Sequence, residues 1–68
     1  MDQETFNLSI RKFLKMVGVN SQREIEQAVQ KAMTDGRVQG SETLPAKVTL
    51  EIPRLGLKVP FDGEIKLE

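Results

Sequence analysis

Apolar residues in the first part of the chain recur at the spacing of one face of an amphipathic helix. They lie at Phe6, Ile10, Phe13, Leu14 and Val17. We therefore predict a helix over residues 3–17. Asp2 is suited to be its N-cap, and Gly18 is suited to the left-handed position that follows a helix end.

A second apolar stripe with the same period begins soon after the first one ends. Its members are Ile25, Ala28, Val29, Ala32 and Met33. Ser21 and Glu24 have the spacing of a capping box, and Asp35-Gly36 is typical of a helix end. These signals predict a second helix over residues 21–35. The short connection through Gly18 predicts an αα-corner or an antiparallel pair of helices.

Beyond a loop expected over residues 36–46, the apolar period changes from 3.6 to 2. This alternation predicts strands at about residues 47–52 and 57–61, and a third at about 65–67. The segment Pro53–Gly56 is expected to connect the first two strands, so that Ile52 faces Leu57. Proline suits the opening of such a turn, and Gly56 is free to adopt a positive φ.

The sequence after Phe61 allows two ways of pairing the second predicted strand with the third. A two-residue turn at Asp62-Gly63 would put Ile65 on the solvent side, so we expect a three-residue bulged turn, Asp62–Glu64, with Phe61 opposite Ile65. Pro60 indicates an edge strand or a local break in pairing. Residues 1–68 are then a single small α+β domain. In this prediction two N-terminal helices pack on a C-terminal antiparallel β-sheet of two or three strands.

Composition narrows the range of functions. The 68 residues include ten basic and ten acidic side chains, and 38% are hydrophobic, which indicates a small folded chain with a thin core. Cysteine and histidine are both missing, so disulfides, thiol chemistry and the usual acid–base and metal-ligating imidazole are excluded. Asp62 and Glu64 are carboxylates without a convincing catalytic partner. We expect no enzyme, no cofactor site and no metal site.

Basic side chains gather on the outer side of the first predicted helix. Leu8, Arg11, Lys12 and Lys15 lie opposite the first apolar stripe, and Arg23 opens the second helix. This face is either an ordinary solvated surface or a contact for an anionic partner. A helix-turn-helix motif around Gly18 is a weaker alternative, because Glu24 stands where such a motif has an apolar residue.

These observations lead to two hypotheses about function. The first is a small non-enzymatic interaction module that binds a protein partner or forms a homodimer, because the core is thin and a sheet edge is expected to be open. That edge is either free to pair or blunted by Lys47, Lys58, Pro60 and Lys66. The alternative is weak nucleic-acid binding through a basic patch around the predicted helix–helix turn, formed by Arg11, Lys12, Lys15 and Arg23. No small-molecule substrate or membrane contact is indicated, and a cytoplasmic location is the expectation.

Four stretches also resemble a family of short bacterial proteins described as a domain of unknown function. They are Phe6–Lys15, Val17–Glu26, Thr43–Lys47 and Phe61–Ile65, and the resemblance extends over nearly the whole chain. The resemblance implies a stand-alone bacterial cytoplasmic protein. It assigns no activity and no site residues.

Overall fold

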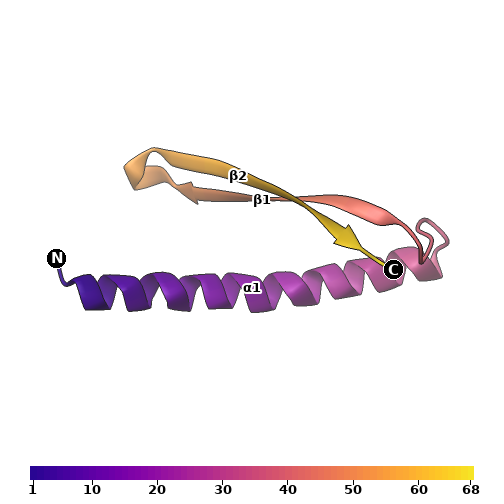
Figure 1. Ribbon diagram of the computed structural model, residues 1–68, viewed down its shortest axis with the longest axis horizontal. Helices are drawn as coiled ribbons and strands as arrows, with labels where there is room; N and C mark the ends of the chain where they lie inside the picture. Colours follow the sequence, from indigo (N-terminus) through magenta and orange to yellow (C-terminus); the bar gives the residue numbers. More distant parts are fainter. The chain divides into compact units, whose positions relative to one another are not determined.

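A computed structural model describes all 68 residues, which form two compact units, Met1–Arg37 and Val38–Glu68 (Figure 1). The first unit is built on one helix, α1 (Gln3–Thr34). The second is an antiparallel hairpin of β1 (Thr43–Ile52) and β2 (Leu57–Lys66), joined by the 3-10 turn η1 (Pro53–Leu55). The α+β class is confirmed. The prediction of two N-terminal helices and the prediction of a third strand are wrong.

Asp2 caps the start of α1, as its position in the sequence predicts. Its Oδ1 atom accepts hydrogen bonds from the backbone N–H groups of Glu4 at 3.0 Å and Thr5 at 3.2 Å. These donors would otherwise be unpaired, because the first turn of a helix has no preceding carbonyl groups. The N–H groups of Thr5 and Glu4 lower the pKa of the Asp2 carboxyl by stabilising its ionised form.

The predicted break at Gly18–Asn20 does not exist, and α1 runs through it. Gly18 does not adopt a positive φ, so it is an ordinary helical residue. A glycine inside a helix costs only about 0.8–1.0 kcal/mol relative to alanine, too little to end a helix held by its neighbours. Asn20 also fits within the helix, because its side-chain amide donates to the Met16 carbonyl at 2.8 Å. The Ser21/Glu24 capping box is therefore not used.

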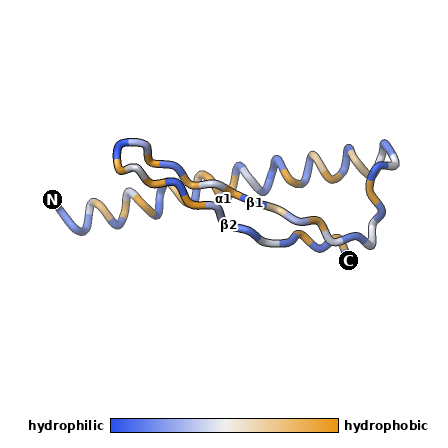
Figure 2. Tube along the Cα trace, turned by 90° about the horizontal axis from the view of Figure 1, so that it is seen from above, coloured by the Kyte–Doolittle hydropathy of each residue, from blue (hydrophilic) through white to orange (hydrophobic).

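The two apolar stripes are in phase across the predicted break. Phe6, Val17 and Ala28 follow one another at intervals of eleven residues, and so do Ile10, Ser21 and Ala32. Eleven residues span three turns at about 3.67 residues per turn, close to the natural period of the α-helix. One continuous helix therefore keeps both stripes on one side, and hydrophobic residues recur along α1 about once per turn (Figure 2).

The end of α1 at Asp35-Gly36 is confirmed. Gly36 has a φ of +76°, and its N–H donates to the Met33 carbonyl at 3.1 Å. The N–H of Arg37 donates to the Ala32 carbonyl at 2.9 Å. This pair of hydrogen bonds is the Schellman motif, in which glycine takes the left-handed position without steric strain.

The turn between the strands is also confirmed. Ile52 lies opposite Leu57, and Gly56 has a φ of +63° with its N–H donating to the Pro53 carbonyl at 3.0 Å. The loop before β1 is shorter than expected. It contains a turn in which the Glu42 N–H donates to the Gln39 carbonyl at 3.1 Å and the Glu42 carboxylate accepts from the Gln39 N–H.

The bulged turn expected at Asp62–Glu64 is wrong, because these residues lie within β2. Asp62 pairs with Lys47, Gly63 with Ala46, and Glu64 with Pro45. β1 begins at Thr43, earlier than its apolar alternation indicates, and so supplies a partner for every residue up to Lys66. The Leu67 N–H then donates to the Glu42 carbonyl at 3.0 Å, which closes the base of the hairpin. The residues of the predicted third strand therefore belong to the end of β2.

Candidate interaction surfaces

The register gives the hairpin one apolar face. Alternate residues of a strand point to the same side, and directly paired residues share that side. Ten positions of this side carry no polar side chain, and we call them the hairpin face: Leu44, Ala46, Val48, Leu50, Ile52, Leu57, Val59, Phe61, Gly63 and Ile65. The other side carries prolines, threonines and charged residues. The hairpin is thus amphipathic over its whole length, and hydrophobicity alternates along both strands (Figure 2).

The centre of the hairpin face is its least covered part. Val48 and Phe61 are paired with each other, and they remain 52% and 58% exposed. Leu50 and Val59, the next pair toward the turn, are half-buried. Val48 and Phe61 therefore form an accessible apolar pair in the middle of the hairpin face.

The polar side of the hairpin limits what its edges can bind. Glu51 and Lys58 form an exposed cross-strand ion pair at 3.9 Å. Residue pairs of an antiparallel hairpin alternate between two types, one with backbone nitrogens that point to the partner strand and one with nitrogens that point outward. The pairs Pro45–Glu64 and Thr49–Pro60 are of the same type, because they are four residues apart along β1. Since proline has no N–H to give to the partner strand, this is the outward type, so Pro45 lies at the outer edge of β1 and Pro60 at that of β2, where neither can donate a hydrogen bond to an added strand. The hairpin face is therefore the better contact surface, since a proline interrupts each edge.

The apolar stripe of α1 is the second apolar surface. We define it as Phe6, Ile10, Phe13, Leu14, Val17, Ile25, Ala28 and Ala32. Its large members are largely accessible, with Phe13 49% and Leu14 54% exposed, whereas Ala32 is buried. An accessible stripe of this length on a helix is a surface that another apolar surface would cover.

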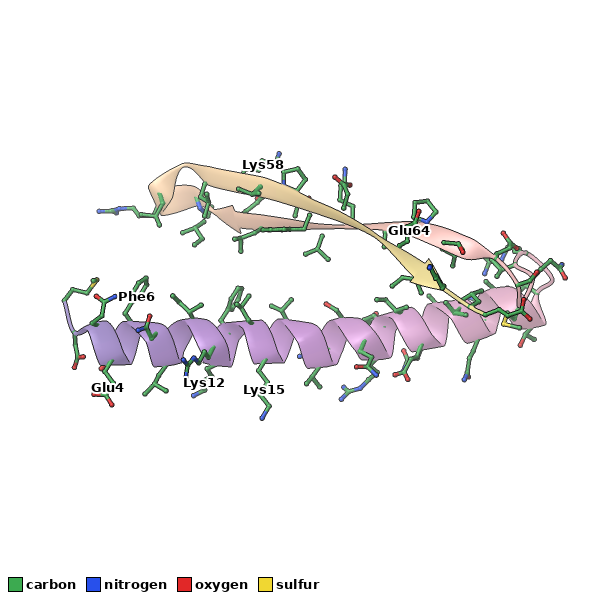
Figure 3. The ribbon with its side chains drawn as sticks, viewed as in Figure 1. Glu4, Phe6, Lys12, Lys15, Lys58 and Glu64 are labelled. Carbon is green, nitrogen blue, oxygen red and sulfur yellow. The ribbon has the colours of Figure 1, made fainter.

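The sequence-predicted contact residues share one side of α1. Arg11, Lys12, Lys15 and Arg23, which we call the basic strip, fall within a sector of about 120°, and Leu8 lies in the same sector. Lys12 and Lys15 project from the side of α1 opposite Phe6 (Figure 3). The continuous helix separates Arg11 from Arg23 by about 18 Å. Arg23 thus joins the other cations along a line and does not flank a turn between two helices.

The basic strip has no acidic side chain within its length. Between Glu4 and Glu24 the sequence contains four cations and no carboxylate. None of the four cations takes part in an ion pair, because the two pairs of the protein join Arg37 to Asp35 and Lys58 to Glu51. The helix-turn-helix alternative is excluded by the helical Gly18.

Neither unit assembles the side chains of a metal site. No three carboxylates lie close enough together to hold an ion. Asp62 and Glu64 lie on the polar side of β2, where they face Lys47 and Pro45 across the hairpin. No helix has the length and apolar character needed to cross a membrane.

The hairpin face as a continuous surface is the feature that sequence reasoning missed. The signal was present in the alternation of Leu57, Val59, Phe61, Gly63 and Ile65, which is unbroken once glycine is counted as a small apolar position. Interpreting Asp62-Gly63 as a turn divides this alternation between two short predicted strands.

The fold and these surfaces define a small α+β chain of one long helix and one hairpin, each with an apolar and a polar side. The model of the Family of unknown function (DUF6494) matches residues 1–68, so the chain belongs to this family over its full length. No curated protein and no solved structure matches the chain.

Proposed function

We propose that this chain is a small non-enzymatic interaction module that acts by binding protein through its apolar surfaces. The observation that carries the proposal is the unbroken hairpin face, which has ten positions without a polar side chain and the accessible pair Val48 and Phe61 at its centre. A two-stranded hairpin is marginal in water unless its apolar face is packed against another element. Binding would therefore also stabilise the hairpin.

The energy available at these surfaces is sufficient for a specific contact. Fully burying a large apolar side chain contributes about 1.5–3 kcal/mol. Phe61 on the hairpin face and Phe13 on the apolar stripe each leave about half of their surface to be covered. Aromatic side chains are also common among the residues that dominate binding energy. These two phenylalanines are the anchors that the proposal predicts.

Site-specific photo-cross-linking tests the proposal directly. A photoreactive phenylalanine analogue replaces Phe61 or Phe13 in cells that express the chain, and Lys58 and Lys12 are matched control positions on the polar sides of the same elements. We expect adducts of discrete mass from the two apolar positions and none from the controls. Equal cross-linking at all four positions, or no protein adduct at any of them, would contradict the proposal.

A second candidate is weak nucleic-acid binding through the basic strip. The observation in its favour is the alignment of four unpaired cations along one side of α1, without an intervening carboxylate. A contact that neutralises about four phosphates should weaken about 50-fold to 150-fold between 50 and 200 mM salt. Fluorescence anisotropy with a labelled oligonucleotide measures this. Absence of binding at 50 mM salt, or binding that Arg11→Glu with Lys15→Glu leaves unchanged, would exclude it.

A further inference from the structure

We propose that the outer edge of β2, from Phe61 to Lys66, binds an extended segment of a partner protein as a third, antiparallel strand. The partner segment carries basic residues opposite Asp62 and Glu64 and a large apolar residue opposite Gly63. The inference rests on the proposed function, because it requires that the chain binds protein. It deepens that function by naming the conformation and the chemistry of the segment that is bound.

The backbone at this edge of β2 has no partner strand. The sheet has two strands, so one side of β2 faces no other strand. The Leu67 N–H donates to the Glu42 carbonyl, which makes these two residues a hydrogen-bonded pair. Because the two types of pair alternate, Asp62, Glu64 and Lys66 belong to pairs whose N–H and C=O groups point outward. Three backbone donors are therefore available in a row for an added strand.

The position of Pro60 limits the length of this free edge. Pro60 has no N–H to donate, so an added strand would lose a hydrogen bond at this residue. From Phe61 to Lys66 the edge contains no proline. A stretch of this length matches a typical strand of about five to six residues. A third strand is also what an isolated hairpin needs to become stable in water.

A strand added beside β2 would extend the hairpin face. Gly63 and Ala46 are the smallest pair of that face, and on β2 Gly63 lies between the larger Phe61 and Ile65. A Cβ built on Gly63 meets no other atom within 4 Å, so the space beside this glycine is open. A large side chain on a neighbouring strand can cover a glycine at a sheet edge and stabilise the pairing. The residue opposite Gly63 is therefore expected to be large and apolar.

The polar side of the same edge is acidic. Asp62 and Glu64 are neighbours on this side, both are exposed, and neither takes part in an ion pair. Residues of opposite charge that face each other stabilise antiparallel strands, whereas like charges destabilise them. Basic residues opposite Asp62 and Glu64 are therefore favoured. Lys66, at the end of the stretch, favours an acidic residue instead.

The outer edge of β1 lacks this pattern. Between Pro45 and Pro53, its polar side carries one cation, one threonine and one acid, which are Lys47, Thr49 and Glu51. The two charges cancel, and Glu51 already belongs to an ion pair. This edge therefore has no excess charge that would select a partner. The edge of β2 is the one with a defined complement.

A peptide of the sequence Glu-Val-Lys-Phe-Lys-Val tests the inference. In the antiparallel register its first residue lies opposite Lys66 and its phenylalanine opposite Gly63, with the two lysines opposite Glu64 and Asp62. Fluorescence anisotropy of the labelled peptide measures binding to the full chain at low salt. The control peptide, Lys-Val-Glu-Phe-Glu-Val, keeps the apolar residues and reverses the charges. We expect it to bind at least about tenfold more weakly, because three attractive pairs become repulsive.

N-methylation of the peptide tests the backbone pairing without any change in the protein. In the proposed strand, the N–H of the lysine opposite Glu64 points toward β2, and the N–H of the phenylalanine opposite Gly63 points away. A methyl group on the lysine nitrogen should therefore abolish binding. A methyl group on the phenylalanine nitrogen should leave binding nearly unchanged.

Substitutions in the protein separate the backbone contact from the charge. Glu64→Pro removes both an outward N–H and a carboxylate, whereas Glu64→Gln removes the carboxylate alone. Thr49→Pro is the matched control, because it makes the same backbone change on the outer edge of β1 and also places proline opposite a proline. We expect Glu64→Pro to abolish binding, Glu64→Gln to weaken it about fivefold at most, and Thr49→Pro to leave it unchanged. Circular dichroism checks that each variant folds, and the methylated peptides decide the question if one does not.

Four results would overturn the inference. They are the absence of peptide binding, equal binding of the two peptides, equal effects of the two methyl groups, and a native dimer in sedimentation velocity that Glu64→Pro dissociates. The last result would place a second copy of the chain at the edge. Photo-cross-linking of Phe61 and Phe13 to a different protein would leave the proposed function standing in each case. The failure of the inference is thus distinguishable from the failure of the proposed function.

Discussion

Replacing Gly18 by alanine should stabilise the protein. Gly18 lies near the middle of α1 with a helical backbone, and a Cβ built on it meets no other atom within 4 Å. Alanine therefore introduces no clash, and it removes the entropy that glycine loses when a helix forms. The gain expected from helix propensity is about 0.8–1.0 kcal/mol. For a chain of this size, that gain raises the midpoint of thermal unfolding by roughly 4–8 °C.

Circular dichroism at 222 nm measures the effect by thermal and urea unfolding, with the native chain and Gly18→Ala at the same concentration so that association does not differ. Gly56→Ala is the matched control. Gly56 has a φ of +63°, where a side chain costs about 1–2 kcal/mol, so this variant should melt at a lower temperature. If Gly18 were the turn between two helices, Gly18→Ala would be destabilising as well. A midpoint that falls or does not change would therefore refute the continuous helix.

Three further predictions follow from the helix ends and the polar side of the hairpin. Gly36→Ala should lower the stability by about 1–2 kcal/mol in urea unfolding, because the Schellman motif requires its φ of +76°. The stabilisation from Asp2 should be full above about pH 5 and decline as the pH falls through its lowered pKa, so Asp2→Asn should flatten the acid limb of a circular dichroism titration. Glu51→Ala should change the stability by no more than about 0.5 kcal/mol, because its ion pair with Lys58 is exposed and 3.9 Å long.

Features that depend on a few neighbouring residues could be predicted from the sequence. The Asp2 cap, the end of α1 at Gly36 and the Pro53–Gly56 turn all need one residue type at one position, and all three are present. The same local reasoning failed at Gly18 and at Asp62-Gly63. In both places the residues tolerate a turn but do not require one. At Gly18 the structure is decided by the helical turns on both sides, from Val17 to Ser21, which continue as one helix. At Asp62-Gly63 it is decided by β1, which pairs with these residues of β2.

The basic strip shows how one such error carries into the candidate site. Lys12 and Lys15 project from the side of α1 opposite Phe6, as their spacing within one predicted helix indicates (Figure 3). Arg23 was assigned to the neighbourhood of a turn, and its alignment with the other three appears only when the helix continues through Gly18.

The angular positions of apolar residues around the helix axis are a stronger criterion than turn-forming residues for deciding whether two apolar stripes belong to one helix or to two. A break of arbitrary geometry leaves the second stripe at any angle to the first, whereas a continuous helix fixes that angle at about 100° per residue. Here the interval from Phe6 to Val17 is repeated from Val17 to Ala28, and the same interval joins Leu14 to Ile25. Two of these three intervals cross the segment Gly18–Asn20, where two independent helices would have no reason to keep the spacing of the first. They outweigh a helical glycine that costs about 1 kcal/mol. The same comparison in β2 joins Leu57, Val59 and Phe61 to Ile65 through Gly63, and it explains why one face of the hairpin is apolar from end to end.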